Sequence, residues 1–392
     1  MTTSTVELVG KASALLQSSQ AERALELLAP HASNKQDDVV YLQTFGEALL
    51  ENNQVETAYQ VLIRGCELDP EAEHGTEKFL YLGQIIGGVD GLNYIDAGLT
   101  RLESQLKCIE DDSITPDAAL VELGKIYSTK NSIASYLIKK LNQGIFAKIE
   151  IWMTDLCMEP EAESQCDNLI TSSLKWDTEN PEAWSLLASI RISQQRSADA
   201  QEALVKAWSL FQIKKTTLED AASKSQQPGH SDESGDFDVN MEYAELLQPL
   251  LTLAKLAIES ELYEIAISAS SGSQDINESL LESYYYEGLA CLLQAKKLHV
   301  AANKSGEDYR EIQLSSSTDE EAQSFLEDAR IALTHGFKLC QGDASEMDEE
   351  VAAQVNELLN EVGGPLMSEL LPKRGGAEEY EGWEEDIESD EE

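Results

Sequence analysis

The residue types that most often catalyse reactions or bind metals are few and scattered in this chain. The five histidines have no carboxylate or cysteine at ligand spacing; they are His31, His74, His230, His299 and His335. The sequence contains no nucleophile elbow, no phosphate-binding loop with its lysine, and no zinc-protease motif. We therefore expect no catalytic residue, no metal site and no cofactor, and predict that the protein is not an enzyme.

One glycine-rich segment, residues 87–91, could cradle a phosphate group. Its sequence is Gly-Gly-Val-Asp-Gly. A phosphate-binding loop follows a strand and ends in Lys-Ser or Lys-Thr, and both features are missing here. We interpret the segment as a lengthened turn between two helices.

Carboxylates are the abundant chemical group, and they favour binding over catalysis. The chain has 73 acidic and 28 basic residues, for a formal net charge of −45. Only ten of the carboxylates lie in the last sixteen residues, so most of the charge belongs to the body of the protein. Such a negative protein repels nucleic acid and anionic lipid and attracts basic proteins. A surface that only promotes solubility, or one adapted to high salt, is the alternative that composition leaves open.

Apolar and small residues recur every 34 residues, in three tandem pairs, and predict the elements that position these carboxylates. The pattern is clearest after Leu42 and after Trp184. Apolar offsets of three, four and seven place the residues on one stripe of a helix. Small residues such as Gly46 and Ala58 let two antiparallel helices approach closely. Tandem helix pairs of this length build a solenoid that presents a binding surface.

The repeats predict an all-α solenoid of antiparallel helix pairs over residues 1–362, followed by a disordered acidic tail over 363–392. Polar insertions at about 214–240 and 303–317 interrupt the solenoid, and we expect the first of them to be flexible. Counting back one repeat from Trp184 places another first helix across Met153 and Cys157. We expect the helix that starts at Ser132 to end at about Gln143, just before Gly144, and regular spacing to return at Phe146.

The six cysteines are spread widely and form no Cys-x-x-Cys motif. This spacing indicates free, buried thiols in a reducing compartment. The first ten residues lack the pattern of a signal peptide, and no stretch reaches the roughly 18 apolar residues of a membrane span. We expect a soluble, intracellular protein.

The repeats resemble those of the tetratricopeptide (TPR) family, and this resemblance implies a right-handed superhelical solenoid. Leu68-Asp69-Pro70 matches the motif that ends such a repeat, and Asn180-Pro181, just before Trp184, resembles the turn that opens one. In a TPR superhelix the first helix of each repeat faces the concave side, so the resemblance implies a lined groove. The partner-binding residues predicted from it are Glu47, Glu51, Glu77, Asp155, Glu159, Glu182, Glu259, Glu282 and Tyr285. This lining suits an extended peptide rich in Lys and Arg, although individual carboxylates could equally belong to a solvated helix face.

Segment 378–388, with Tyr380 and Trp383 among carboxylates, resembles the fungal TPR-repeat assembly chaperones of large-subunit ribosomal protein four. In that family an acidic superhelix clasps a long basic loop of the newly made ribosomal protein until nuclear import and delivery to the pre-ribosome. The resemblance implies a dedicated chaperone of that basic ribosomal protein, located in the cytoplasm and nucleus. It also implies a nuclear import factor and the pre-ribosome as further partners, with no direct contact to nucleic acid or membrane. The alternative is a general TPR scaffold subunit of a multiprotein complex.

Overall fold

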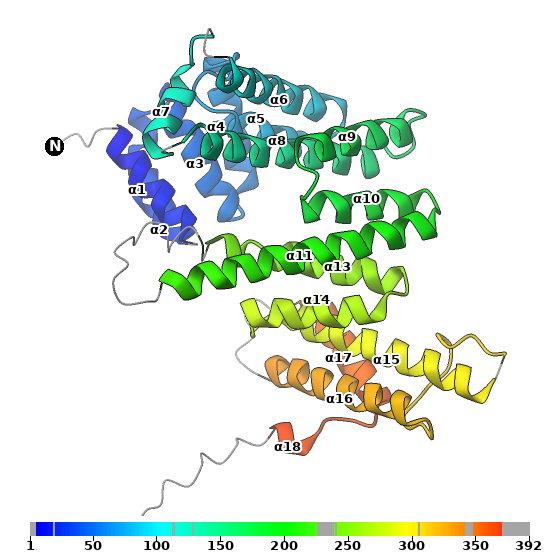
Figure 1. Cartoon of the computed structure of the whole chain (residues 1–392). Helices are drawn as coiled ribbons and strands as arrows, with labels where there is room; N and C mark the ends of the chain where they lie inside the picture. The colour runs from blue at the N-terminus through cyan, green and yellow to red at the C-terminus, as the bar shows by residue number, and fades with distance from the viewer. Residues whose placement is uncertain are drawn as a thin grey trace, which may run out of the picture. The chain divides into compact units, whose positions relative to one another are not determined.

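The computed structural model describes residues 5–18, 20–111, 114–127, 129–225, 239, 241–304, 306–341 and 348–370. Over these ranges the chain is helical and forms no strand. It divides into two compact units, unit 1 (Met1–Glu245) and unit 2 (Leu246–Glu392), whose helices are labelled in Figure 1.

Unit 1 is built from antiparallel helix pairs. Its helices are α1 (Thr5–Gln17), α2 (Ala21–Leu28), the 3-10 helix η1 (Ala29–Asn34), α3 (Val39–Glu51), α4 (Val55–Leu68), α5 (Glu77–Ile86), α6 (Gly88–Glu110), α7 (Ala118–Ile126), α8 (Lys130–Met153), α9 (Ala162–Trp176), α10 (Pro181–Ser193) and α11 (Ser197–Ser225). The pairs α1/α2, α3/α4, α5/α6, α8/α9 and α10/α11 pack together (Figure 1). The helices α1, α3, α5, α8 and α10 also contact one another in that order, which forms a row of neighbouring first helices.

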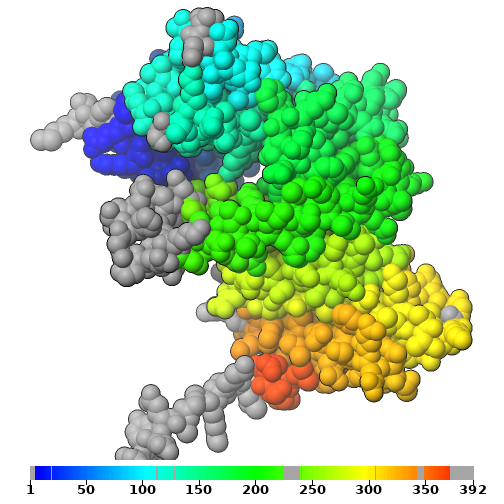
Figure 2. Space-filling view, viewed as in Figure 1, coloured from blue at the N-terminus to red at the C-terminus, as the bar shows by residue number. Residues whose placement is uncertain are grey.

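Unit 2 repeats the same arrangement with fewer pairs. Its helices are α13 (Leu247–Glu259), α14 (Tyr263–Ile276), α15 (Leu281–Asn303), α16 (Glu320–Cys340), α17 (Glu349–Glu361) and α18 (Met367–Leu370). Helices α13 and α14 form one pair, and α15 with α16 forms another, against which α17 packs. In the space-filling view the yellow side chains of α15 meet the orange ones of α16 along a continuous surface (Figure 2). The prediction of an all-α, TPR-like chain of helix pairs is confirmed.

Three of the turns between paired helices have the same backbone geometry. Asn53, Gln195 and Glu261 each adopt a positive φ, between 56° and 61°. In the first turn, the N–H of Asn53 donates to the carbonyl of Leu50 and the N–H of Gln54 donates to that of Leu49. The other two turns repeat both hydrogen bonds. This Schellman geometry satisfies the last carbonyls of the first helix and reverses the chain, so the sequence repeat is also a repeat of turn geometry.

Two glycines lie where neighbouring helices approach closely, Gly46 and Gly144. A Cβ added at Gly46 on α3 would lie 2.4 Å from the Cδ2 atom of Leu62 on α4. The sequence predicts Ala58 as the facing residue, and the nearest side chain is instead Leu62, one helical turn further on. At Gly144 on α8, an added Cβ would lie 2.7 Å from the Cδ2 atom of Leu99 on α6.

The structure corrects two helix boundaries. We expected a break near Gly144, but α8 runs unbroken from Lys130 to Met153 because that glycine serves close packing and not a turn. We also expected residues 214–240 to be an insertion, but α11 continues to Ser225. Leu218 is buried there, and Lys215 pairs with Glu219 one turn on, which favours the helix. Residues 226–238 lie outside the described residues.

The 304–319 segment, predicted as a polar insertion at about 303–317, is anchored on unit 2. Leu314 is buried in the core, and its backbone N–H donates to a carboxylate oxygen of Glu361 on α17 at 3.2 Å. The hydroxyls of Tyr309 and Tyr263 lie 2.7 Å apart. Residues 363–370, predicted as the start of the disordered tail, pack on α16: α18 contacts that helix, and the Arg330 guanidinium donates to the carbonyls of Gly363 and Gly364. Residues 371–392 lie outside the described residues, so the disorder of that part of the tail stays a prediction.

The prediction of buried thiols holds for four of the six cysteines, which lie on helices: Cys66, Cys108, Cys166 and Cys291. Cys157 is exposed and Cys340 is half-buried. Burial raises the pKa of Cys66 to about 12 and that of Cys166 to about 11. Among the described residues, no helix combines the length and apolarity needed to cross a bilayer.

Candidate peptide-binding site

A buried ion pair positions the start of α5. The Lys78 ammonium, with a fully buried side chain, donates to Asp69 at 2.8 Å. The same carboxylate accepts from the backbone N–H groups of Glu73 and His74, each at 2.9 Å. Burial acts to raise the pKa of Asp69, but these donors hold it below its ordinary value. Asp69 belongs to the repeat-ending motif, so this motif fixes the first turn of α5, which carries Glu77.

Glu47 and Glu77 lie in one polar network that joins α3, α5 and α8. The Gln43 amide on α3 donates to Glu77 on α5 at 3.0 Å. The Tyr81 hydroxyl on α5 donates to Glu47 on α3 at 3.3 Å. The Tyr136 hydroxyl on α8 donates to the second oxygen of Glu77 at 3.0 Å. We call this set the α3–α5–α8 cluster.

The pKa values of the two carboxylates in the α3–α5–α8 cluster are shifted in opposite directions. Burial raises the pKa of Glu47, and the charges of Glu77 and Glu51 add to that rise against the opposing effect of Lys140. Burial also acts on Glu77, but Lys140, 3.9 Å away, and the Tyr136 hydroxyl lower the pKa of Glu77 below its ordinary value. Glu77 is therefore fully compensated by its own chain, whereas Glu47 is a carboxylate short of cationic partners.

Glu51 completes the group at the exposed C-terminal end of α3. Its charge acts on Glu47 and on Tyr81. Three of the residues predicted from the TPR resemblance, Glu47, Glu51 and Glu77, therefore lie together in unit 1.

Glu182 belongs to a second group, at the start of α10. Burial raises the pKa of Glu182, the charges of Lys214 and Lys139 oppose this, and that of Glu245 reinforces it. Lys139 on α8 in turn pairs with Glu245 at 2.5 Å. This group holds two glutamates and two lysines, so its net charge is smaller than the predicted carboxylate lining implies.

Asp155 and Glu159 are not on a helix that lines a groove. Helix α8 ends at Met153, and both acids lie exposed in the turn before α9. Asp155 accepts from the backbone N–H of Gly88, at 2.8 Å, and so caps the start of α6. The prediction of a first helix across Met153 and Cys157 is wrong, because the α8/α9 turn is longer than the turns of the other pairs of unit 1. The prediction of a lengthened turn over residues 87–91 is wrong, because α5 ends at Ile86 and α6 begins at Gly88, so that Gly87 alone links the two helices. The N–H group of Gly88 donates to Asp155 of the same chain.

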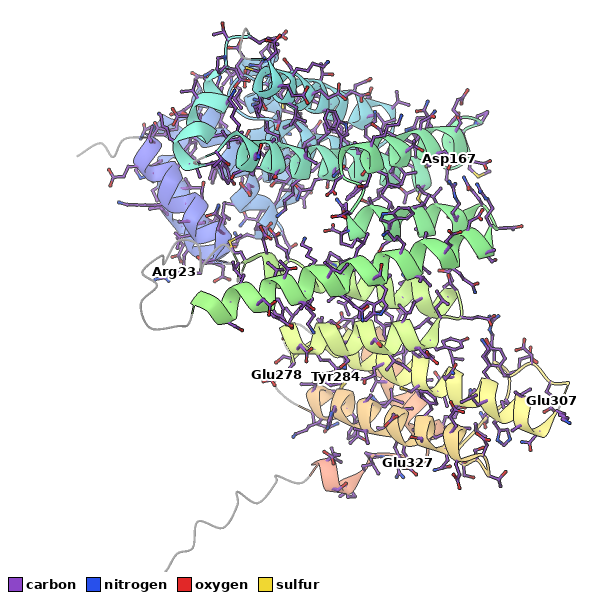
Figure 3. The ribbon with its side chains drawn as sticks, in the orientation of Figure 1. Arg23, Asp167, Glu278, Tyr284, Glu307 and Glu327 are labelled. Atoms are coloured by element: carbon purple, nitrogen blue, oxygen red, sulfur yellow. The ribbon has the colours of Figure 1, made fainter. Side chains whose placement is uncertain are left out.

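The remaining three predicted residues lie in unit 2. Glu259 is exposed at the C-terminal end of α13. Glu282 is in the first turn of α15, and Tyr285 follows on the same helix, half-buried. The adjacent Tyr284, labelled in Figure 3, turns back to the start of α15 and donates to the carbonyl of Glu278 at 3.0 Å.

The sequence interpretation missed the tyrosines and the lysine of the α3–α5–α8 cluster. Gln43 and Glu77, like Glu47 and Tyr81, are 34 residues apart, so the repeat itself holds the signal for Tyr81. No such spacing leads to Tyr136 or Lys140, because α8 departs from the repeat length.

The arrangement is suited to holding cations without chemistry. Within the described ranges, no three His, Cys, Asp or Glu side chains are grouped closely enough to bind a metal ion. Carboxylates backed by tyrosine hydroxyls and rings bind ammonium and guanidinium groups through charge-assisted hydrogen bonds and cation–π contacts.

Comparison with known proteins gives consistent similarities. Residues 279–389 match the family profile described as ACL4 C-terminal domain. The chain is 29% identical over 242 residues to a "Probable assembly chaperone of rpl4" of Schizosaccharomyces pombe, a match that covers 61% of this chain and 59% of the relative. A protein with the same description from Emericella nidulans is 27% identical over 404 residues, covering 98% of this chain and 88% of the relative.

Among solved structures, "Assembly Chaperone of RpL4 (Acl4)" matches with a TM-score of 0.56 and 23% identity, covering 76% of this chain and all of that one. This similarity supports the fold. The resemblance to fungal assembly chaperones of large-subunit ribosomal protein four, predicted from the sequence, is confirmed by the relatives' descriptions.

Proposed function

We propose that this protein is a dedicated chaperone of the ribosomal protein named in its relatives' descriptions, rpl4, and acts without catalysis. Its carboxylates bind a basic extended segment of the newly made protein and shield it from RNA and other polyanions. A flexible cationic segment aggregates with polyanions unless an anionic surface covers it.

The α3–α5–α8 cluster is the observation that carries this proposal. Glu47 is a half-buried carboxylate whose pKa is raised by burial and by neighbouring acids. A cation from a partner would relieve this repulsion, so part of the binding free energy is already built into the unliganded cluster. Glu77 supplies the second charge, held in place by Gln43 and Tyr136.

Affinity purification of the full chain from its own cells tests the proposal. We expect one basic ribosomal protein in near-equal amount with the chain, lost when Glu47 and Glu51 are both changed to Lys. Several partners that persist through purification, in place of one, would favour a general scaffold. Unchanged capture by Glu47→Lys/Glu51→Lys would exclude the cluster as the binding surface.

The proposal extends to escort into the nucleus, with an import factor and the pre-ribosome as successive partners. We therefore expect the fluorescently tagged protein to occur in both the cytoplasm and the nucleus. A signal confined to the cytoplasm when nuclear export is blocked would contradict this part alone and leave the binding proposal standing.

A further inference from the structure

The described residues form three tyrosine–tyrosine pairs, and two of them hold a cation of their own chain. In unit 1, the rings of Tyr127 and Tyr136 lie 5.4 Å apart. The Lys140 ammonium lies 5.7 Å from the Tyr136 ring centre and 3.9 Å from a carboxylate oxygen of Glu77. The lysine therefore lies over one ring of the pair and beside one carboxylate.

The second pair, in unit 2, has the same composition. Tyr263 and Tyr309 are 6.5 Å apart in an edge-to-face arrangement. Lys297 lies over the first ring at 5.4 Å and the Arg310 guanidinium over the second at 5.6 Å. Both cations also pair with Glu261. In both pairs, therefore, a cation of the chain lies over a tyrosine ring and beside a carboxylate.

The third pair, Tyr285 and Tyr286 on α15, has the rings and the carboxylates but no cation. The ring centres are 5.3 Å apart with an interplanar angle of 52°. Burial raises the pKa of both hydroxyls, and the charges of Glu357 on Tyr285 and of Glu282 on Tyr286 add to the rise. No lysine or arginine of the described residues lies over either ring or pairs with Glu282 or Glu357.

The rings of the third pair are available to a partner. Both tyrosines are half-buried and Glu357 is exposed. Neither hydroxyl makes a hydrogen bond to another described side chain, unlike the hydroxyls of Tyr263 and Tyr136, which do. Tyr285 packs against the core of unit 2, and the Tyr286 ring lies against that of Tyr285.

We propose that the Tyr285–Tyr286 pair binds an arginine side chain of the partner's basic segment, with Glu282 and Glu357 as counter-charges. The guanidinium group is planar and more weakly hydrated than an ammonium group, so it stacks on an aromatic ring at a lower desolvation cost. The inference rests on the proposed function, which supplies the basic segment, and adds the kind of side chain recognised and the residues that recognise it.

The test compares two labelled peptides of equal charge, eight repeats of Gly-Arg and eight of Gly-Lys, on the full chain by fluorescence anisotropy. We expect the wild type to bind the arginine peptide about two- to fivefold more tightly, the size of an exposed cation–π contact. Tyr286→Leu should bring this ratio close to one, while the lysine peptide changes less than twofold. Tyr286→Phe keeps the ring and should keep the ratio.

The outcomes separate this inference from the proposed function. If both peptides bind the wild type equally, or if Tyr286→Leu keeps the wild-type ratio, the arginine site is wrong and the proposed function stands. If neither peptide binds the wild type, both are wrong. Equal thermal midpoints for the Leu and Phe variants confirm that the ratio reports recognition and not unfolding; should Tyr286→Leu unfold, Glu282→Gln/Glu357→Gln must lower the ratio instead.

Discussion

Glycine 46 tests the helix crossing at the scale of one atom. In Gly46→Ala the new Cβ would lie 2.4 Å from the Cδ2 atom of Leu62, a fully buried side chain. We expect this overpacking to lower the free energy of unfolding by about 1–3 kcal/mol in a urea titration. Gly124→Ala on α7 is the matched control, because no atom lies within 4 Å of its added Cβ. It should be neutral or gain up to about 1 kcal/mol; equal losses for both variants would contradict the crossing.

The Asp69–Lys78 pair makes a second prediction at the residue scale. Asp69→Asn leaves the Lys78 ammonium buried without its counter-charge, so we expect a loss of about 3–5 kcal/mol at pH 7. The pKa of Asp69 is lowered in the folded state. The unfolded chain therefore binds more protons around pH 4, and this stabilisation is present above that pH and lost as the pH falls through the folded pKa.

Urea titrations of wild type and Asp69→Asn across the acidic range measure this linkage. The difference in free energy of unfolding between the two proteins should be largest above about pH 5. It should decrease below about pH 4, the ordinary aspartate pKa. A gap that stays constant with pH would show that the variant acts through packing and not through charge.

At the scale of elements, α3 and α5 present carboxylates with opposite effects on stability. The raised pKa of Glu47 means that its charge is unfavourable in the folded state, so Glu47→Gln should stabilise the protein at pH 7, by about 0.5 kcal/mol. The lowered pKa of Glu77 means that its charge is favourable, so Glu77→Gln should cost about 1–3 kcal/mol. Both variants should bind a basic peptide more weakly, because each removes a charge from the surface proposed to hold it.

Thermal melts and peptide titrations of the two variants, done side by side, test whether Glu47→Gln stabilises the protein while Glu77→Gln destabilises it. A Glu47→Gln protein that is both less stable and unchanged in binding would mean that Glu47 has a structural role only. The pair is informative because the two residues share one network, so a general disturbance of the cluster would move both stabilities downward.

Much of these elements was predictable from the sequence, and the exceptions have physical causes. The spacing after Leu42 predicts α3 and α4, and it brings Glu47, Glu51 and Glu77 together because those repeats keep their length. Asp155 was misplaced because α8 is fused across Gly144 into one long helix, after which the turn to α9 is lengthened. From the sequence alone, a lone glycine such as Gly144 indicates a helix break. The structure shows that Gly144 instead makes room for Leu99 of α6. The sequence also could not predict that Leu314 is buried, because a single apolar residue in a polar segment forms no periodic pattern.

The 304–319 segment provides a prediction for an irregular element. Leu314→Ala should cost about 2–5 kcal/mol, because Leu314 is buried in the core of unit 2. It should also free the segment, seen as faster amide exchange of its backbone and as new protease cleavage there. Ser316→Ala is the control, since Ser316 is exposed and should change stability by less than about 0.5 kcal/mol. Identical exchange in the two variants would mean that the segment is held by its polar contacts alone.

Over the whole molecule, the net charge of −45 makes stability and binding respond to salt in opposite directions. Like charges on the folded chain repel one another, and salt screens this repulsion, so the thermal midpoint should rise with ionic strength. Attraction to a basic segment is screened by the same ions, so its affinity should fall. Raising salt from about 0.01 M to about 1 M shortens the screening length from about 30 Å to about 3 Å. At the higher concentration both the repulsion within the chain and the attraction to the basic segment are largely screened. We therefore expect a more stable protein that binds a lysine-rich peptide at least tenfold less well. An affinity independent of salt would mean that apolar contacts, and not the carboxylates, hold the partner.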